Sequence, residues 1–187
     1  SGLDVDIKIF HQDVLSFSPD FWEESYSVVA NIPYYITSPI LRHFLYEVKN
    51  TPENMLILMQ KDVADKILGG KKKKSSVLSL FIEKKCRVSE KIFVPKESFI
   101  PAPKVESSVL LFETHQNFNH VDDTKFFELI KAGFSEPRKK CIKNLLKAGY
   151  DGQKISEFLT QKWYDENFRG EDGDMEFWGE LYLYLNS

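Results

Sequence analysis

The sequence predicts an open α/β sheet over residues 1–114 and a small all-helical domain over residues 115–187. Short apolar runs alternate with helical patterns up to about residue 113, and this alternation is typical of an open α/β sheet. Residues 114–123 are polar like a linker, and only helical spacing follows them. With 42% hydrophobic and 28% charged residues, the 187-residue chain has the balance of a globular protein.

Five short apolar segments bounded by turn residues or helical patterns are expected to form strands. Residues 54–60 are apolar on both faces, which predicts a strand in the middle of a parallel sheet. Residues 26–30 are rich in β-branched side chains and end abruptly at a turn. The predicted strands are residues 7–10, 26–30, 54–60, 86–94 and 107–113.

Helices are expected where apolar residues recur at helical spacing. Thr37 or Ser38 is expected to cap a helix that has Pro39 in its first turn, and Phe21 and Trp22 are expected to pack a short helix. Three prolines within residues 95–105 predict a stiff loop. The other predicted helices are residues 61–69, 75–85, 123–134, 136–149, 152–162 and 174–186.

The net charge of −3 conceals a basic middle. Residues 1–30 carry a net charge of −5 and residues 151–187 carry −6, so the residues between them carry +8. A basic middle suits a polyanion, although a pI of about 5.9 argues against unselective coating of nucleic acid. Taken alone, each of the two basic clusters is more simply a solvated surface. The clusters are Lys71, Lys72, Lys73 and Lys74, and Arg138, Lys139, Lys140 and Lys143.

Several classes of protein are excluded or disfavoured. The chain has no apolar run of about 18 residues and no signal-peptide pattern at its first residues. Cys86 and Cys141 are too few for a disulfide framework and lie in no C-x-x-C pair. This predicts reduced thiols in a cytoplasmic protein. The four histidines form no metal-ligand pattern, so no metal site is expected.

The chemistry is expected where the second predicted strand ends, at Asn31-Ile32-Pro33-Tyr34. Ligands bind at the carboxyl ends of strands in open α/β sheets. Pro33 stiffens the turn and can leave the Ile32 carbonyl aimed outward. This carbonyl and the Asn31 amide oxygen suit the exocyclic amino group of a planar base, on which Tyr34 can stack. The alternative is a structural strand-to-helix turn with a capping Asn and a core Tyr.

This segment, extended to Pro39, resembles the amino-methyltransferase motif of the KsgA family of small-subunit ribosomal RNA adenine dimethyltransferases. Residues 59–64, 99–109 and 134–140 resemble further segments of that family in the same order, so the resemblance covers essentially the whole chain. It implies the partial Rossmann-like sheet of an S-adenosylmethionine-dependent methyltransferase, followed by a helical RNA-binding domain. The implied reaction transfers methyl groups to N6 of adjacent adenines in a small-subunit rRNA hairpin loop, a step of ribosome biogenesis.

The resemblance implies a role for each residue of the motif. Asn31 and the Ile32 carbonyl would accept hydrogen bonds from adenine N6 and align its lone pair with the donor methyl. Tyr34 would stack on the base after the base has left the RNA stack, with Phe99 on the opposite face. Asp13, together with Asn31, would contact S-adenosylmethionine. The alternative for Asp13 is a turn residue.

The resemblance also implies partners for the basic clusters. Arg138, Lys139, Lys140 and Lys143 would lie on a helix of the C-terminal domain, where relatives meet ribosomal RNA. Lys71, Lys72, Lys73 and Lys74 would contact RNA as well, although Ser75-Ser76 departs from the pair that relatives often carry there. The expected partner is small-subunit rRNA or the 30S particle, with no membrane and no metal, and the intact protein is expected to be a monomer.

Two features of the family are missing from the sequence. No G-x-G-x-G follows a strand, and no acidic residue is placed to hold the cofactor ribose. By resemblance the chain begins at the third strand, so residues 7–10 would lack their neighbours in the sheet. We therefore expect a truncated form that binds S-adenosylmethionine poorly. The alternatives are an Erm-type large-subunit rRNA methylase and a non-catalytic rRNA-binding assembly factor.

Overall fold

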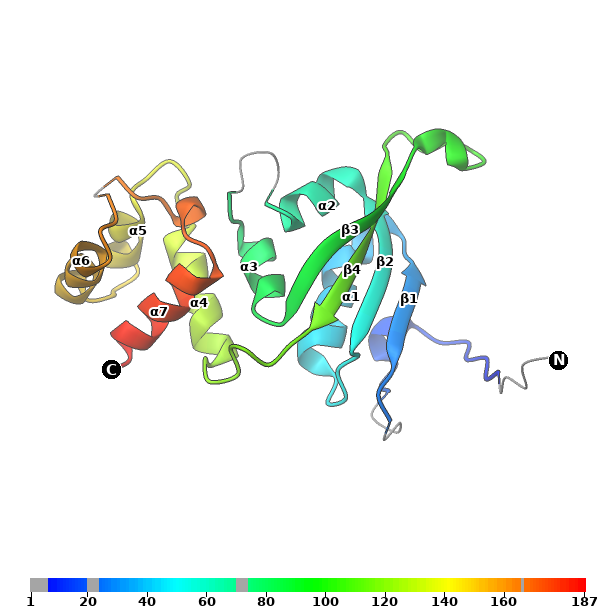
Figure 1. Cartoon of the computed structure of the whole chain (residues 1–187), viewed down its shortest axis with the longest axis horizontal. Helices are drawn as coiled ribbons and strands as arrows, with labels where there is room; N and C mark the ends of the chain where they lie inside the picture. The colour runs from blue at the N-terminus through cyan, green and yellow to red at the C-terminus, as the bar shows by residue number, and fades with distance from the viewer. Residues whose placement is uncertain (1–6, 20–23, 70–73, 166) are drawn as a thin grey trace.

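The computed structural model describes residues 7–19, 24–69, 74–165 and 167–187. Its four strands form one mixed sheet in the order β1-β2-β4-β3 (Figure 1). β1 is parallel to β2, whereas β4 is antiparallel to both β2 and β3. The strands are β1 (Ser27–Asn31), β2 (Asn54–Gln60), β3 (Cys86–Val94) and β4 (Ser107–Thr114).

The helices fall into two groups along the described chain. The first group lies within residues 37–83, among the strands along the chain. The second lies within residues 123–185 and forms the helical region at one end of the molecule (left in Figure 1). The α-helices are α1 (Thr37–Arg42), α2 (Lys61–Ile67), α3 (Val77–Glu83), α4 (Asp123–Gly133), α5 (Cys141–Lys147), α6 (Gly152–Gln161) and α7 (Met175–Leu185). Shorter turns are η1 (Val14–Ser16), η2 (Tyr34–Ile36), the π-helical η3 (His43–Glu47), η4 (Lys96–Ser98) and η5 (Gly170–Asp172).

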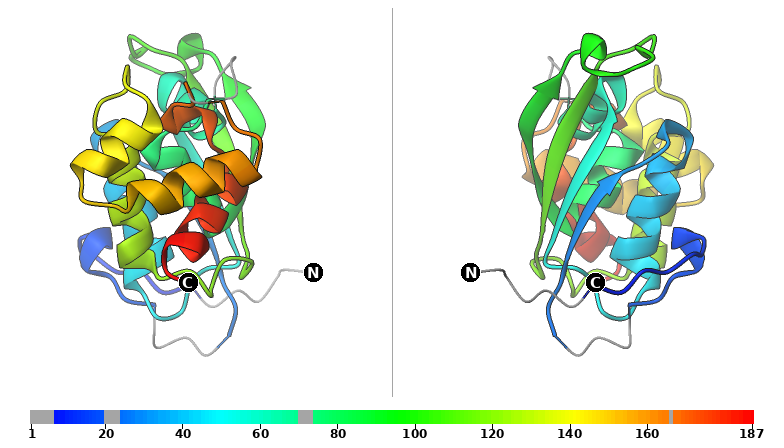
Figure 2. Two further views of the ribbon diagram at one scale, coloured as in Figure 1. Left: turned by 90° about the vertical axis from the view of Figure 1, so that its left-hand side faces the viewer. Right: turned by 90° about the vertical axis from the view of Figure 1, so that its right-hand side faces the viewer.

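One face of the sheet is buried and the other is partly open. The inward residues of β2, which alternate with partly exposed ones, are Met55, Ile57 and Met59. On the open face, Val29 is 79% exposed and lies in register with Leu56. Figure 2 (right) shows the strands side by side, with α1 beside β1 and the helical region behind them. The prediction that residues 54–60 form a central strand is confirmed, but the all-parallel sheet is wrong because β4 runs antiparallel.

The N-terminal segment differs from the prediction. Residues 7–10 form no strand, and Ile9 is 91% exposed. A strand needs a neighbour for its backbone hydrogen bonds, and β1, at the edge of the sheet, pairs with β2 alone among the described strands. The helix predicted around Phe21 and Trp22 lies outside the described residues.

Two helix starts also differ. Ile36, rather than Thr37 or Ser38, precedes α1, and the Thr37 hydroxyl donates to the Tyr34 carbonyl at 3.1 Å. The helix predicted over residues 136–149 begins only at Cys141, because the Cys141 N–H donates to the Phe168 carbonyl (2.7 Å) rather than within a helix. Residues 135–140 therefore form a turn. The remaining predicted helices of the described residues are confirmed to within a few positions.

Two hydrophobic cores meet at α3. One lies between the sheet and α1–α3, and the other lies among α4–α7 and includes Leu80 of α3. The rings of Phe81 and Phe127 stack across the junction with centroids 4.7 Å apart. Lys84, only 1% exposed, donates to the Val121 carbonyl at 2.8 Å and pairs with Asp123. The domain boundary between residues 114 and 115 falls near this junction and stays a prediction.

The two buried thiols predict a loss of stability in alkali. Burial raises the pKa of both Cys86 and Cys141 from 9.0 to about 12. The unfolded chain therefore releases these protons at lower pH than the folded chain, so their stabilising effect is full below about pH 9 and is lost toward pH 12. We expect the free energy of unfolding in urea to fall across this range, and to fall less steeply in Cys141→Ala. Equal slopes in the two proteins would contradict this.

Candidate functional site

The motif that begins at Asn31 lies where β1 ends, at the upper edge of the sheet in Figure 1, whereas Asp13, Lys74 and the second basic cluster lie elsewhere. β1 and β2 are parallel, so Asn31 ends beside Leu58 near the carboxyl end of β2. The antiparallel β4 begins at the same edge, where Ser107 lies in register with Gln60 and with Val94. This edge therefore collects the ends of β1, β2 and β3 and the start of β4.

The turn from Asn31 to Tyr34 is anchored to the core of the sheet by one buried side chain. Asn31 is the last residue of β1, and its exposed side chain has no hydrogen-bond partner among the described residues. The Ile32 side chain is buried in the core of the sheet. Pro33, with φ −58° and ψ 134°, turns the chain into η2, and its carbonyl accepts from the Ile36 N–H at 3.1 Å. The turn is therefore anchored on one side and leaves the Asn31 amide free to bind a ligand.

Tyr34 is held by hydrogen bonds at its backbone carbonyl and at its side-chain hydroxyl. Its carbonyl accepts from the Thr37 hydroxyl, and its own hydroxyl lies 2.8 Å from the Ser107 hydroxyl, with either oxygen able to donate. Ser107 is fully buried, whereas the Tyr34 ring is half-buried. The next residue, Tyr35, is 85% exposed. Tyr34 thus places an aromatic ring, fixed by its hydroxyl contact, at the edge of the sheet where the Asn31 amide oxygen can accept a hydrogen bond.

Phe99 lies in the proline-rich loop, whose two ends are at the same edge of the sheet. The loop joins β3 to β4, contains η4, and has a cis peptide bond between Ile100 and Pro101. Phe99 is half-buried, and its N–H donates to the Lys96 carbonyl at 3.3 Å. Among the described residues, no ring contact joins Phe99 to Tyr34. The loop begins and ends at the edge where Tyr34 lies, so the position of Phe99 over the ring of a bound base stays a prediction.

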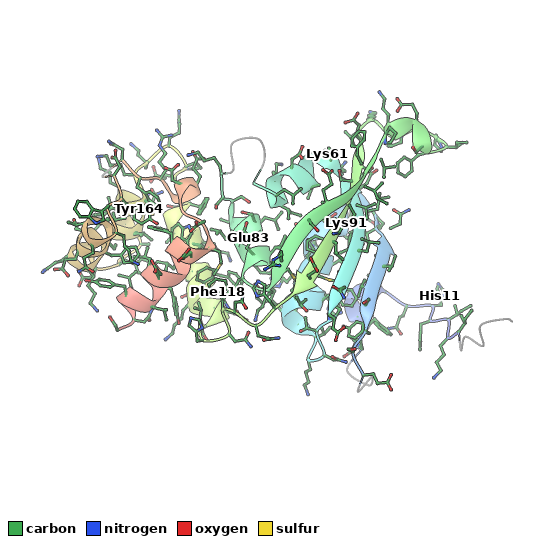
Figure 3. The ribbon with its side chains drawn as sticks, viewed as in Figure 1. His11, Lys61, Glu83, Lys91, Phe118 and Tyr164 are labelled. Carbon is green, nitrogen blue, oxygen red and sulfur yellow. The ribbon has the colours of Figure 1, made fainter. Side chains whose placement is uncertain are left out.

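Asp13 lies apart from this edge arrangement. Its carboxylate caps η1 by accepting from the Leu15 N–H at 3.0 Å. His11, two residues earlier, lies away from the sheet in Figure 3. Asp13 and Asn31 share no hydrogen bond among the described residues, and their common contact with a cofactor stays a prediction.

The predicted RNA-binding residues have different surroundings. Lys71, Lys72 and Lys73 lie outside the described residues. Lys74 pairs with Asp172 and lies 3.8 Å from Glu171, and the hydrogen bond that its ammonium donates to Asp172 raises the pKa of Lys74.

The second basic cluster lies where the helical region turns into α5. Arg138, Lys139 and Lys140 occupy the turn before α5, so their predicted place on a helix is wrong. Lys143 is exposed on the first turn of α5 itself. The Asn144 side chain steadies this turn by donating to the Gly133 carbonyl at 2.8 Å and to the Glu136 carbonyl at 3.1 Å.

The structure adds residues that the sequence did not single out. A charged cavity of about 430 Å³ lies between α2 and the proline-rich loop. Lys61, which opens α2 at this edge (Figure 3), pairs with Asp65 at 2.5 Å and with Glu90 at 3.3 Å. The Ser108 hydroxyl donates to Glu90 at 2.5 Å and lowers the pKa of that carboxyl. The pair Ser107-Ser108 after the loop was the available signal, but the partners of these serines are distant in sequence.

Two absences hold for residues 7–19, 24–69, 74–165 and 167–187. No helix in those ranges is long and apolar enough to cross a membrane. Nor do three or more His, Cys, Asp or Glu residues gather there in a way that could hold a metal ion.

The fold is shared with solved rRNA methyltransferases. A dimethyladenosine transferase from Plasmodium falciparum superposes with a TM-score of 0.77 at 19% identity, over 95% of this chain and 71% of that one. The 23S rRNA methyltransferase ErmE superposes with a TM-score of 0.74 at 21% identity, over 94% of this chain and 70% of that one. The chain thus has a methyltransferase-type α/β region followed by helices, as predicted.

Sequence comparison defines the family. The family model Ribosomal RNA adenine dimethylase matches residues 2–167. A Ribosomal RNA small subunit methyltransferase A from Desulfitobacterium hafniense is 40% identical over 91% of this chain and 62% of its own length. Its counterpart from Fusobacterium nucleatum is 36% identical over 82% of this chain and 59% of its own length. This chain belongs to the ribosomal RNA adenine dimethylase family, and it spans about 60% of the length of these relatives.

Proposed function

We propose that this chain supplies the target-base side of a small-subunit rRNA adenine dimethyltransferase. The complete protein would transfer methyl groups to N6 of adjacent adenines in a hairpin loop. The proposal is carried by the turn from Asn31 to Tyr34 at the carboxyl end of β1, in a chain of the rRNA adenine dimethylase family. In this proposal residues 1–114 belong to the catalytic domain and residues 115–187 to the RNA-binding domain.

Asn31 and Ile32 would bind and orient the reacting nitrogen. Adenine N6 is a poor nucleophile because its lone pair is delocalised into the ring. The Asn31 amide oxygen and the Ile32 carbonyl can accept hydrogen bonds from the two N–H groups of N6 and so hold the nitrogen in one orientation. Preorganised acceptors of this kind favour the transition state over the ground state. The Asn31 side chain is exposed and has no hydrogen-bond partner among the residues that the structure describes, which supports this role.

Tyr34 and Phe99 would hold the base itself. The base has to leave the RNA stack before its N6 can be reached, and aromatic side chains offset the cost of unstacking. Tyr34 would supply one face and Phe99, carried by the loop between β3 and β4, the other. The hydroxyl of Tyr34 contacts Ser107, the residue at which the loop carrying Phe99 enters β4, and this supports the arrangement.

S-adenosylmethionine is the methyl donor in this proposal, and Asp13 and Asn31 are its proposed contacts in the complete protein. The described residues do not fit a complete cofactor site. Asp13 uses its carboxylate to cap η1, and residues 7–10 lie outside the sheet. We therefore expect calorimetric titration of this chain to show no micromolar binding of S-adenosylmethionine. Micromolar affinity would contradict this account of the cofactor.

The base-binding role is tested by RNA binding to this chain. A fluorescein-labelled hairpin of the small-subunit type carries either two adjacent adenines or two inosines, in which a 6-oxo group replaces the 6-amino group. We expect the adenine hairpin to bind roughly five-fold more tightly or better, because inosine leaves the Asn31 and Ile32 acceptors unsatisfied. Asn31→Ala should reduce this preference. Equal affinity for both hairpins would refute the proposed base site.

A second candidate is a non-catalytic rRNA-binding factor, because the exposed Arg138 and Lys139 can contact RNA phosphates without a cofactor. Its binding to the hairpin would not depend on the adenine amino groups and would survive Asn31→Ala. Erm-type methylation of large-subunit RNA is the enzyme alternative. The two hairpins and the Asn31 variant distinguish the non-catalytic factor from our proposal. The choice of RNA substrate distinguishes the Erm-type methylase from it.

The basic turn before α5 is proposed to contact RNA phosphates. Each phosphate contact contributes about 0.7–0.9 to the slope of log K against log salt, depending on the nucleic acid. Reversing the charge of Lys139 and Lys140 to Glu should therefore reduce the slope by about 1.5. Lys125→Glu with Lys154→Glu makes the same change in net charge elsewhere in the helical region and serves as the control. An unchanged slope in the first variant would exclude this turn from the RNA interface.

A further inference from the structure

Tyr34 is tied across the sheet edge to a residue that lies 73 positions away in sequence. Its hydroxyl and the Ser107 hydroxyl are 2.8 Å apart. The ring itself is only half-buried, so packing covers one part of it and leaves the rest accessible. The hydroxyl contact is the one polar tie that the described residues make to the side chain of Tyr34.

Ser107 is held in place by the sheet. It is the first residue of β4 and lies in register with Gln60 of β2 and Val94 of β3. It has no exposed surface, so its hydroxyl has no competing water. Ser108, the next residue, points its hydroxyl to Glu90 instead. The two neighbouring serines therefore serve different partners from one rigid strand.

We propose that Ser107 is a positioning residue that fixes the plane of the Tyr34 ring for stacking against the target purine. This inference rests on the proposed function of the site. A tyrosine on a short turn can rotate about two side-chain torsions, and a hydrogen bond from a rigid strand removes much of that freedom before the base arrives. Preorganisation of this kind lowers the entropic cost of binding. Ser107 acts through Tyr34 and does not touch the base.

The test uses this chain and a hairpin in which 2-aminopurine replaces the target adenine. The probe keeps a purine face but lacks the 6-amino group, so quenching of its fluorescence reports stacking rather than contact with Asn31. We expect the chain to quench the probe, and Ser107→Ala to weaken binding roughly two- to twelve-fold, the range of one net hydrogen bond. The quenching at saturating protein should fall as well, which a change in stability alone would not cause.

Ser108→Ala is the matched control, because it removes a hydroxyl with equal burial from the adjacent position. It should leave both the affinity and the quenching close to those of the unsubstituted chain. Tyr34→Phe removes the same hydrogen bond from the other side and keeps the ring, so it also tests the proposal if Ser107→Ala fails to fold. The double variant should lose no more than either single variant, since coupled residues are not additive.

The possible failures are distinguishable. If the unsubstituted chain quenches the probe but Ser107→Ala and Tyr34→Phe match it, the positioning role is wrong and the proposed base site stands. If Ser108→Ala loses as much as Ser107→Ala, the effect is a general loosening of β4 and the positioning role is again wrong. If the unsubstituted chain binds no hairpin or quenches nothing, the proposed function fails and this inference falls with it.

Discussion

Asn31→Ala is expected to lower the rate of methyl transfer by about 100- to 1000-fold, or about 2.7–4 kcal/mol, by analogy with the loss of one oxyanion-hole donor. The reason is that the alanine offers no acceptor to hold adenine N6 in its reactive orientation. The assay uses a chimera in which this chain is joined to the part of the Desulfitobacterium hafniense relative that it does not span. Incorporation of tritiated methyl groups into small-subunit RNA measures the rate.

The control for this variant is Tyr35→Ala. Tyr35 follows the motif directly but is 85% exposed, and it has no proposed role in holding the base. It should retain a rate within a few-fold of the unsubstituted chimera. A chimera with Asn31→Ala that turns over as fast as the unsubstituted one would remove Asn31 from the mechanism.

Asp123→Ala is expected to destabilise the chain by about 2–3 kcal/mol, less than the ~3–5 kcal/mol for breaking a fully buried pair, because Lys84 is buried but Asp123 is 39% exposed. Burial lowers the pKa of Lys84, and the hydrogen bond to Asp123 opposes that shift, so the carboxylate helps to keep the ammonium charged. Lys84→Met should cost far less. It removes the buried charge, and Asp123 keeps Lys85 at 3.2 Å. Urea denaturation measures both changes in the free energy of unfolding.

Asp122→Ala provides the comparison for Asp123→Ala. Asp122 is the N-cap of α4, and its carboxylate accepts from the Lys125 N–H at 2.9 Å. Loss of such a cap costs about 1 kcal/mol. The predicted order of destabilisation is therefore Asp123→Ala, then Asp122→Ala. The opposite order would mean that the buried ammonium does not depend on Asp123.

The sequence predicted elements whose signal is local. Residues 86–94 match β3, and the end of β1 at Asn31 was predicted from β-branched residues followed by a turn. Residues 7–10 carry the same local signal, but no described strand pairs with them, so no strand forms. The late start of α5 had a similar cause. The contact of Cys141 with Phe168 joins residues that no local pattern relates.

The candidate site divides in the same way. The motif residues from Asn31 to Tyr34 share one turn, so their proximity followed from the sequence and from the resemblance. The Tyr34–Ser107 and Ser108–Glu90 hydrogen bonds depend on the register of β4 against β2 and β3, which hydrophobic patterning does not specify. Lys74 was predicted to contact RNA from its lysine cluster together with the resemblance, and its pairing with Asp172 of η5 became visible only in the folded chain.

We propose that this chain positions adenines of small-subunit rRNA for methylation. The most direct measurement gives the chimera tritiated S-adenosylmethionine with small-subunit and large-subunit RNA in parallel, after calorimetry has established that the chimera binds the cofactor. The account predicts label in the small-subunit RNA, at N6 of adjacent adenines in a hairpin loop, and its loss in Asn31→Ala. Label in the large-subunit RNA, or in neither RNA, would contradict it.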